Sequence, residues 1–343
     1  MKKVNVGIIG CGVIAPSHIE SYRNLEGVRV VGVCDPVEER VRKIQDAYPE
    51  LELAGYASLA DLLAGSSVQA VSICTDHASH ESLLLEALSA GCHVLCEKAL
   101  TTNRASLERM LTAAKASDRV SAAVLQHRFD PINRELKRLL DDGALGRLLT
   151  VSCQHECFRE RDYYSGDAWR GTWKFEGGSL LINQSIHFID ILQWLAGGVS
   201  GVEAATANLE HEGVIETEDT ASLLLRLRNG GLGSFIATSG SHRRWDYAFQ
   251  FVGSEGRVEI ANGTLKTVSH RDPGIEAALT KALTELREGG GVSAAKDYYG
   301  SGHPAQVRDF IAAIREGRSP EVSFFDAREA MEIVFAAYAS AGS

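Results

Sequence analysis

Short apolar runs alternate with amphipathic segments through the first 125 residues. The apolar runs are Val4–Ile9, Val28–Cys34, Ala70–Cys74, His93–Cys96 and Val120–Val124. Between them, apolar positions recur at helical spacing in Ala15–Asn24, Val37–Tyr48, Ser79–Ala90 and Arg104–Ala116. Runs of this kind are typical of strands buried between two layers of helices. The strand–helix order predicts a first domain, residues 1–125, with a doubly wound parallel sheet and right-handed crossovers.

The pattern changes after about residue 125. Four later segments have helical spacing: Pro131–Asp142, Gly178–Leu195, His303–Glu316 and Asp326–Ala341. Leu148–Phe158 alternates like a half-exposed strand, and strand-like runs with Gly-rich turns follow between Val202 and Val268. Such runs favour an antiparallel sheet with one face available for packing. We therefore predict an α/β chain whose second domain, residues 126–343, is α+β with a mostly antiparallel open sheet. The stretch 285–302, rich in Gly and Ser, is predicted to be a mobile loop.

Composition narrows the class of protein. The chain has 343 residues, 45% apolar and 23% charged, which suits a globular protein of two domains. Its net charge of −10 argues against broad nucleic-acid binding. The first residues, MKKVNVGIIG, resemble the start of a secretory signal, but Asn5, Gly7 and Gly10 interrupt the apolar run. We interpret this segment as a first strand, and we expect a cytoplasmic protein with no membrane span.

Seven cysteines are spread along the chain, mostly in or beside apolar runs, where Cys acts as a small apolar residue. Cys153, His155 and Cys157 alternate, so a strand would place all three on one face. A zinc site is conceivable there, but no fourth ligand stands at a recognisable spacing. We interpret the three as ordinary strand residues and expect no metal.

A glycine-rich segment follows the first apolar run. Gly10-Cys11-Gly12-Val13-Ile14-Ala15 has the pattern G-x-G-x-x-A, and Asp35 ends the next predicted strand. In a dinucleotide site, Gly10 permits the tight turn, Gly12 lets the backbone approach the pyrophosphate, and the helix beginning near Val13 and Ile14 offers free N–H groups. Asp35 would bind the ribose hydroxyls and repel a 2′-phosphate, which favours NAD over NADP.

An alternative is a Gly-rich turn without a nucleotide, in which Asp35 caps a helix. Thr75 and His80 follow the strand that ends at Cys74, at the sheet edge where cofactors bind. For each of these two residues, helix capping and cofactor contact are equally good interpretations.

Further motifs resemble those of the Gfo/Idh/MocA oxidoreductases, named for glucose–fructose oxidoreductase and inositol dehydrogenase. The Glu-Lys-Pro motif of that family matches Glu97-Lys98-Ala99, with Ala in place of Pro. Its Asp-x-x-x-His motif matches the run from Asn183 to His187, with Asn in place of Asp. The resemblance covers essentially the whole chain. It implies a Rossmann domain that binds NAD, with Glu97 and Lys98 at the cofactor, and a second domain that binds substrate and self-associates.

The resemblance implies that Lys98 and His187 are the catalytic residues. Lys98 follows a strand end, where an ammonium could polarise the substrate oxygen and relay its proton. His187 suits a general base or acid because imidazole titrates near neutral pH. Asn183 can orient the histidine ring or bind a substrate hydroxyl, but it supplies no charge. Lys98 is therefore expected to carry more of the proton transfer than it does in relatives that have Asp at this position.

Polar and aromatic residues cluster just before the predicted His187 helix. Aromatic rings suit the faces of sugars, and arginines suit phosphates or carboxylates. The substrate-contact candidates are Arg128, Arg159, Tyr163, Trp169, Arg170, Asn183 and His187. The Asn-Gln-x-Ile-His run is similar to that of family members acting at C3 of nucleotide sugars or sugar phosphates.

The resulting hypothesis is an NAD-dependent dehydrogenase or reductase that acts on a hydroxyl-bearing carbon of a sugar, cyclitol, sugar phosphate or nucleotide sugar. One alternative is an NAD-dependent glycosidase that oxidises C3 transiently. Another is a non-catalytic dinucleotide-binding regulator, against which the presence of both Lys98 and His187 argues. From the resemblance we expect a homodimer or homotetramer formed through the outer face of the antiparallel sheet.

Overall fold

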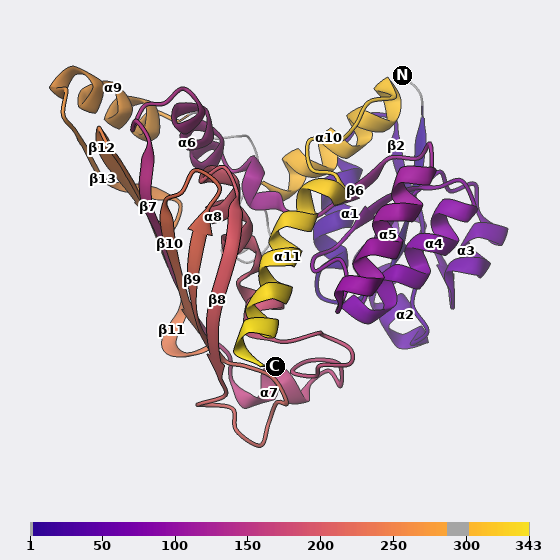
Figure 1. Cartoon of the computed structure of the whole chain (residues 1–343). Coiled ribbons are helices and arrows are strands. Elements are labelled where there is room, and N and C mark those ends of the chain that lie inside the picture. The colour runs from indigo at the N-terminus through magenta and orange to yellow at the C-terminus, as the bar shows by residue number, and fades with distance from the viewer. Residues whose placement is uncertain (1–2, 287–301, 343) are drawn as a thin grey trace. The chain divides into compact units, whose positions relative to one another are not determined.

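The computed structural model describes residues 3–286 and 302–342, which form two compact units (Figure 1). The first unit comprises Met1–Gln126 with Gly291–Ala327, and the second comprises His127–Gly290 with Arg328–Ser343. The closing segment near His303 therefore packs with the first unit, although the sequence analysis placed it in the second domain. The reason is an apolar helix face, described below, that completes the core of the first unit. Most of the predicted loop 285–302 lies outside the described residues.

The first unit is built on a six-stranded parallel sheet in the order β3-β2-β1-β4-β5-β6. Its strands are β1 Val4–Ile9, β2 Val28–Cys34, β3 Ala54–Tyr56, β4 Ala70–Ile73, β5 His93–Cys96 and β6 Ser121–Ala123. This order confirms the predicted doubly wound sheet. The sequence analysis missed β3 and α3 Leu59–Gly65, which are too short for a periodic pattern to reveal them.

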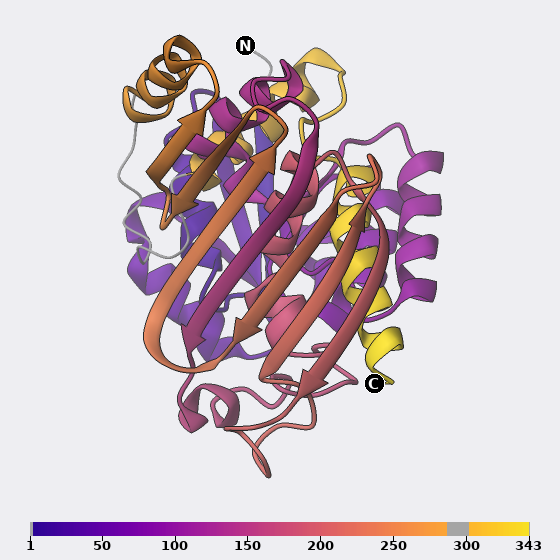
Figure 2. The same cartoon turned by 60° about the vertical axis from the view of Figure 1, so that its left-hand side comes forward.

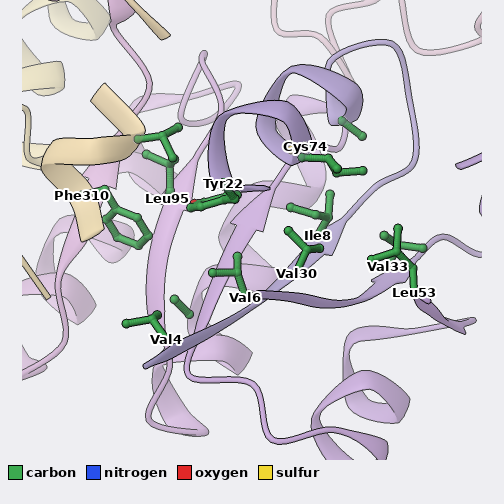
Figure 3. Close-up of a cluster of buried hydrophobic side chains, with 14 of the residues drawn as sticks. Val4, Val6, Ile8, Tyr22, Val30, Val33, Leu53, Cys74, Leu95 and Phe310 are labelled. Atoms are coloured by element: carbon green, nitrogen blue, oxygen red, sulfur yellow. The ribbon is translucent and has the colours of Figure 1, made fainter. Parts of the chain in front are cut away.

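Helices cover both faces of this sheet. They are α1 Ala15–Arg23, α2 Glu38–Ala47, α3, α4 His80–Ser89, α5 Arg104–Ala116 and α10 His303–Glu316, with single 3-10 turns at Pro49–Leu51 and His77–Ser79. Figure 3 shows Val4, Val6 and Ile8 of β1 in one buried cluster with Tyr22 of α1 and Phe310 of α10. Side chains alternate along a strand, so Gly7 faces α3 on the opposite side of the sheet. The apolar face of α10 thus belongs to this core.

The second unit is built on a seven-stranded sheet in the order β13-β12-β11-β7-β10-β9-β8 (Figure 2). The strands are β7 Leu148–Phe158, β8 Val199–Ala207, β9 Thr220–Leu227, β10 Leu232–Thr238, β11 Gly240–Gly253, β12 Gly256–Ala261 and β13 Thr264–His270. Strands β7 and β10 pair in parallel, and all other neighbours are antiparallel. The predicted open, mostly antiparallel sheet is confirmed.

Helices of the second unit pack on one face of this sheet. They are α6 Pro131–Asp141, α7 Arg161–Ser165, α8 Ile186–Leu195, α9 Pro273–Thr284 and most of α11 Phe324–Ala341, and a 3-10 turn spans Gln126–Phe129. The single helix predicted for Gly178–Leu195 is instead a π-helical turn, Leu180–Gln184, followed by α8. Within the described ranges, no helix combines the length and the apolar character that a membrane crossing requires.

Candidate functional site

The glycine-rich segment forms a tight turn between β1 and α1. Gly10 has a φ of +89°, and a Cβ placed there would lie 2.7 Å from the carbonyl oxygen of Cys74. A Cβ at Gly12 would meet nothing within 4 Å, so its outer side is open to a ligand. Val13 is exposed, and Ile14, the N-cap residue of α1, makes no side-chain capping hydrogen bond. Pro16 has no N–H, and the Ala15 and Ser17 amides donate to the Gly12 and Ile14 carbonyls. The amides just before α1, from Gly12 to Ile14, are therefore the ones suited to bind phosphate oxygens, and the loop fits the pyrophosphate of a dinucleotide.

Asp35 lies at the end of β2, beside this turn. Its Oδ2 accepts a hydrogen bond from the Cys11 amide at 3.0 Å, and its Oδ1 accepts one from the Val37 amide at 2.9 Å. The carboxylate is thus fixed against the glycine turn, at the position where a dinucleotide fold places the residue that binds ribose. Burial, and then the charge of Asp35, raises the pKa of the Cys11 thiol to about 12, so Cys11 stays protonated at neutral pH.

Thr75 and His80 meet at the end of β4. The Thr75 hydroxyl donates to the carbonyl of Asp76 at 3.3 Å, and the Thr75 methyl group lies against Gly10. His80 is fully buried, with Nδ1 2.9 Å from the Ala99 carbonyl and Nε2 3.2 Å from the Thr75 carbonyl. Burial lowers the pKa of His80, and a neutral ring donates only one of these two bonds. His80 thus links the ends of β4 and β5.

Glu97 and Lys98 directly follow β5. The Glu97 side chain is buried: its Oε2 accepts the Lys98 amide at 3.1 Å, and its Oε1 lies 3.0 Å from His18 Nε2. Lys98 is half-buried, and the peptide bond between Lys98 and Ala99 is cis. The Glu97 carboxylate therefore holds the main chain of Lys98 from the interior of the first unit.

In the second unit, the π-helical turn changes the surroundings of Asn183. Its amide nitrogen donates to Oε1 of Glu176, and the other oxygen of Glu176 accepts the Gly171 amide at 2.5 Å. Glu176 is fully buried. The sequence pattern did not point to this residue, which lies seven positions before Asn183 and ahead of the helix predicted for Gly178–Leu195. A carboxylate is therefore hydrogen-bonded to the Asn183 side chain, although Asn stands at the motif position where the family has Asp.

His187 lies in the first turn of α8 and is buried. Its ring packs edge-to-face against His127, with the ring centroids 5.2 Å apart. His127 Nδ1 lies 2.6 Å from Oδ2 of Asp130, which orients the His127 ring. The pair formed by His127 and Asp130 is a second site feature that the sequence analysis did not identify.

Arg128 and Asp190, from separate elements, form a buried bidentate ion pair. The Arg128 Nε and Nη2 atoms lie 2.7 and 2.6 Å from the two carboxylate oxygens of Asp190. The guanidinium also lies over the Trp194 ring, 5.3 Å from its centroid. These contacts join the segment before α6 to α8. The substrate contact predicted for Arg128 stays a prediction.

Four of the other substrate candidates meet in one cluster. The Arg159 guanidinium donates to Gln184 Oε1 at 2.6 Å, and the Gln184 amide donates to the Tyr163 hydroxyl at 2.9 Å. Arg170 lies 4.0 Å from the Tyr163 ring centroid and 5.5 Å from that of Trp169. Gln184, which was not among the candidates, connects the cluster to the π-helical turn. We call Arg159, Tyr163, Trp169, Arg170 and Gln184 the arginine–aromatic cluster.

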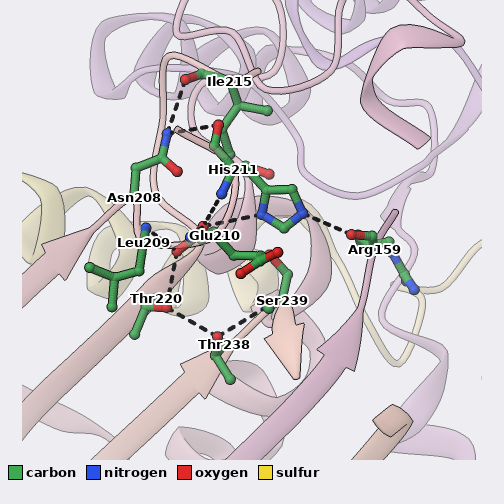
Figure 4. Close-up of polar contacts among 12 residues, drawn as sticks. Arg159, Asn208, Leu209, Glu210, His211, Ile215, Thr220, Thr238 and Ser239 are labelled. Atoms are coloured by element: carbon green, nitrogen blue, oxygen red, sulfur yellow. Dashed lines mark hydrogen bonds and ion pairs between the residues drawn. The ribbon is translucent and has the colours of Figure 1, made fainter. Parts of the chain in front are cut away.

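A buried hydrogen-bond network holds the backbone of Arg159 (Figure 4). Asp219 accepts the amides of Leu209, Glu210 and His211 at 2.9, 2.7 and 2.9 Å. The His211 ring lies between Asp219 and the Arg159 carbonyl, 3.1 Å from the first and 2.8 Å from the second. Burial alone would raise the pKa of Asp219, but the backbone hydrogen bonds more than offset this effect and lower it. The network thus fixes the loop and positions Arg159.

The predicted zinc candidates lie on the buried face of β7, as their alternation indicated. Cys153, His155 and Cys157 are all buried, and His155 Nδ1 lies 2.9 Å from Ser185 Oγ. Among the described residues, the three do not form a group whose ligand atoms converge. They are core residues of the second unit.

Two family models match the chain in sequence. One is described as "Oxidoreductase family, NAD-binding Rossmann fold" and matches residues 4–124; the other, "Oxidoreductase family, C-terminal alpha/beta domain", matches residues 137–343. The chain belongs to the Gfo/Idh/MocA oxidoreductase family. This membership confirms the resemblance, the enzyme class and NAD as the cofactor.

Named members of the Gfo/Idh/MocA family align over nearly the full chain. Myo-inositol 2-dehydrogenase of Thermotoga maritima is 25% identical and covers 97% of this chain and 95% of its own. D-apiose dehydrogenase of Paraburkholderia graminis is 27% identical, and the alignment covers 99% of this chain and 88% of the relative. The crystal structure of the WlbA dehydrogenase from Bordetella pertussis, in complex with NADH and UDP-GlcNAcA, is similar with a TM-score of 0.87 at 27% identity. The match covers 99% of this chain and 96% of that one.

Proposed function

We propose that the protein transfers a hydride between nicotinamide and a hydroxyl-bearing carbon of a sugar, cyclitol, sugar phosphate or nucleotide sugar. The observation that carries this proposal is the open glycine turn with Asp35 fixed beside it, in a chain that matches the oxidoreductase family in both units. The relatives named above are dehydrogenases, which favours this reaction over the glycosidase and regulator alternatives.

Each unit has its own part in the proposed reaction. Gly10, Gly12, Asp35 and Thr75 of the first unit bind the dinucleotide, which accepts or supplies the hydride when bound. The residues of the second unit bind the polyol. Residues 1–125 are accordingly the proposed cofactor domain, and most of residues 126–343 form the substrate domain.

Lys98 and His187 are the proposed catalytic residues. Lys98 polarises the substrate oxygen and relays its proton, and Glu97 holds the Lys98 main chain in place. His187 accepts or returns the hydroxyl proton, and its packing against His127 holds the ring. Asn183, oriented by Glu176, presents its amide oxygen as an acceptor for a neighbouring substrate hydroxyl.

The arginine–aromatic cluster is the proposed site for the rest of the substrate. Trp169 offers a flat apolar surface for a sugar ring. Arg159 and Arg170, whose guanidinium groups lie 5.0 and 4.0 Å from the Tyr163 ring centroid, supply positive charge for a carboxylate or phosphate, and Arg170 also pairs with Asp167 at 3.2 Å. The relative solved with UDP-GlcNAcA supports the inclusion of nucleotide sugars in the substrate screen. The Asn-Gln-x-Ile-His run, which resembles that of family members acting at C3, favours C3 as the position of oxidation.

The deciding experiment is a screen of cyclitols, free sugars, sugar phosphates and nucleotide sugars for NADH formation. With the best substrate, Lys98→Met should lower kcat by about 10²–10⁴-fold, because a positioned proton donor is lost, while NADH binding measured by tryptophan fluorescence stays unchanged. Lys115→Met, on the exposed side of α5, is the matched control and should keep wild-type activity. Full turnover by Lys98→Met would remove Lys98 from the mechanism.

We further propose that the protein acts in the cytoplasm and self-associates through the outer face of the seven-stranded sheet. Leu224, Leu232 and Ile236 are exposed at alternate positions of β9 and β10, where each is 44–50% accessible. Neighbouring apolar side chains on an open sheet face favour burial against a second copy.

A further inference from the structure

Three metal-binding side chains converge in the interior of the first unit. His18 comes from α1, Glu97 follows β5, and His303 begins α10, which packs beside α1. His18 Nε2 lies 3.0 Å from Glu97 Oε1, His303 Nε2 lies 3.3 Å from His18 Nε2, and His303 Nε2 lies 3.9 Å from Glu97 Oε1. All three residues are less than 7% exposed. The proposed function uses the other oxygen of Glu97 and leaves this cluster unexplained.

Hydrogen positions in the cluster follow from the surrounding serines. Ser21 Oγ donates its only hydrogen to the Ser17 carbonyl at 2.7 Å, so it must accept from His303 Nδ1 at 3.1 Å. In a neutral His303 ring, Nε2 then carries no hydrogen and presents a lone pair.

One lone-pair acceptor, His303 Nε2, and one carboxylate oxygen, Glu97 Oε1, therefore lie 3.9 Å apart, and both lie beside His18 Nε2. At most one hydrogen, on His18, is available to all three atoms while both rings are neutral. The interior thus brings a carboxylate oxygen and at least one lone-pair nitrogen within 3.9 Å of each other, an arrangement that a cation stabilises.

The distances fit a metal ion. A triangle with sides of 3.0, 3.3 and 3.9 Å has a centre about 2.0 Å from each corner, which matches Zn–N and Zn–O bond lengths of about 2.0–2.2 Å. The mean separation, about 3.4 Å, is also close to that between ligands of a tetrahedral zinc ion. Among the described residues, this is the one group of three or more His, Cys, Asp or Glu side chains whose ligand atoms converge within 4.8 Å.

The outer nitrogens of both histidines are oriented as metal-bound imidazoles require. His303 Nδ1 donates to Ser21, and His18 Nδ1 lies 3.1 Å from Ser72 Oγ, which is 2.9 Å from the Tyr22 hydroxyl. The bond to Ser21 fixes the tautomer that directs His303 Nε2 at the ion, and a bond donated by His18 Nδ1 to Ser72 would do the same for His18.

We propose that His18, Glu97 and His303 bind one divalent transition-metal ion, with Zn²⁺ favoured by the two-nitrogen, one-oxygen donor set and the tetrahedral spacing, and with water in the fourth position. The sequence pattern gave no sign of this set, whose members are 79 and 206 positions apart, and no metal was expected. The ion joins α1, the end of β5 and the start of α10. Because Glu97 also accepts the Lys98 amide, the ion fixes the main chain of Lys98 as well.

The test is a metal titration of the untagged full-length chain, purified with a chelator that is then removed. We expect one Zn²⁺ per chain after desalting, measured by elemental analysis, and a higher Tm in the presence of zinc. Co²⁺ should give the visible absorption bands of a four-coordinate ion. His18→Gln and His303→Gln should lose these bands, whereas His242→Gln, an exposed histidine of β11, should keep them.

Two results would overturn the proposal. One is a wild-type chain that retains no ion and shows no zinc-dependent Tm, which would leave the cluster as a hydrogen-bonded network that shares a proton. The other is a cobalt spectrum that survives His303→Gln in a variant folded by circular dichroism. Should that variant not fold, the wild-type titration decides by itself. NADH binding measured in the same samples keeps this outcome separate from that of the proposed dehydrogenase.

Discussion

His155 lies on the buried face of β7, beside Ser185 and the Phe188 ring. Burial, followed by the positive charges of Arg159 and His127, lowers its pKa to about 3. An unfolded chain has a histidine pKa of about 6.5, so the unfolded state takes up a proton first as the pH falls. The stability that the neutral ring contributes is therefore complete above pH 6.5 and is lost progressively toward pH 3.

This pKa difference predicts that, when the pH falls from 7.5 to 5, protonation of His155 in the unfolded state reduces the free energy of unfolding by about 2 kcal/mol. Urea unfolding at both pH values measures it. His155→Gln should show a pH dependence smaller by that amount, and the exposed His242→Gln should match the wild type. Equal pH dependence in His155→Gln and the wild type would contradict the prediction.

Asp35 acts through its charge as well as its hydrogen bonds. Asp35→Asn removes the repulsion of a 2′-phosphate, so the preference for NAD over NADP, measured as the ratio of kcat/KM values, should fall at least about tenfold. Some NAD affinity is lost too, because an amide cannot accept from both Cys11 and Val37. Asp118→Asn, in an exposed ion pair with Arg119, should leave the ratio unchanged. An unaltered ratio in Asp35→Asn would exclude Asp35 from cofactor choice.

At the scale of elements, the turn between β1 and α1 depends on contact with the end of β4. Gly10→Ala would place a Cβ 2.7 Å from a backbone oxygen that cannot move aside. We expect NADH binding to weaken at least about tenfold, or about 1.4 kcal/mol, as measured by fluorescence titration. Gly91→Ala is the matched control, because Gly91 has a φ of +77° and open space around it. It shares the backbone strain of about 1–2 kcal/mol and should bind NADH normally. Equal binding by both variants would show that the turn does not contact the cofactor.

The π-helical turn before α8 shows why element boundaries decide side-chain partners. Regular α-helical spacing would place Asn183 and His187 on one face. The inserted turn instead directs Asn183 to Glu176 and Gln184 to Arg159 and Tyr163. Both pairings depend on a local departure from the spacing that the sequence pattern assumes.

At the scale of the whole molecule, the outer face of the seven-stranded sheet is the proposed interface between copies. Ile236→Glu places a charge on this face and should reduce the oligomer to monomers, as measured by size-exclusion chromatography with light scattering. Leu209→Glu is the control, because Leu209 is 70% exposed but precedes β9 outside the sheet. A wild-type chain that is already monomeric, or an Ile236→Glu variant that remains associated, would contradict the proposed interface.

The local pattern of the sequence was enough to predict most strands and helices of the first unit and the fold class of the second unit. Gly10, Gly12 and Asp35 were identifiable because strand, turn, helix and strand follow one another between Val4 and Cys34. The missed elements β3 and α3 span too few residues for a periodic pattern to stand out. The 12-residue helix α9 Pro273–Thr284 was also not predicted.

Tertiary structure alone decided which distant side chains meet. Glu176 lies behind Asn183, Asp219 holds the backbone of Arg159 through His211, and His303 joins His18 and Glu97 from the far end of the chain. No periodicity links such residues, because their proximity arises from the packing of whole elements. The sequence determined the fold class and the cofactor loop; the folded chain determined the polar partners that give each candidate site its charge and its geometry.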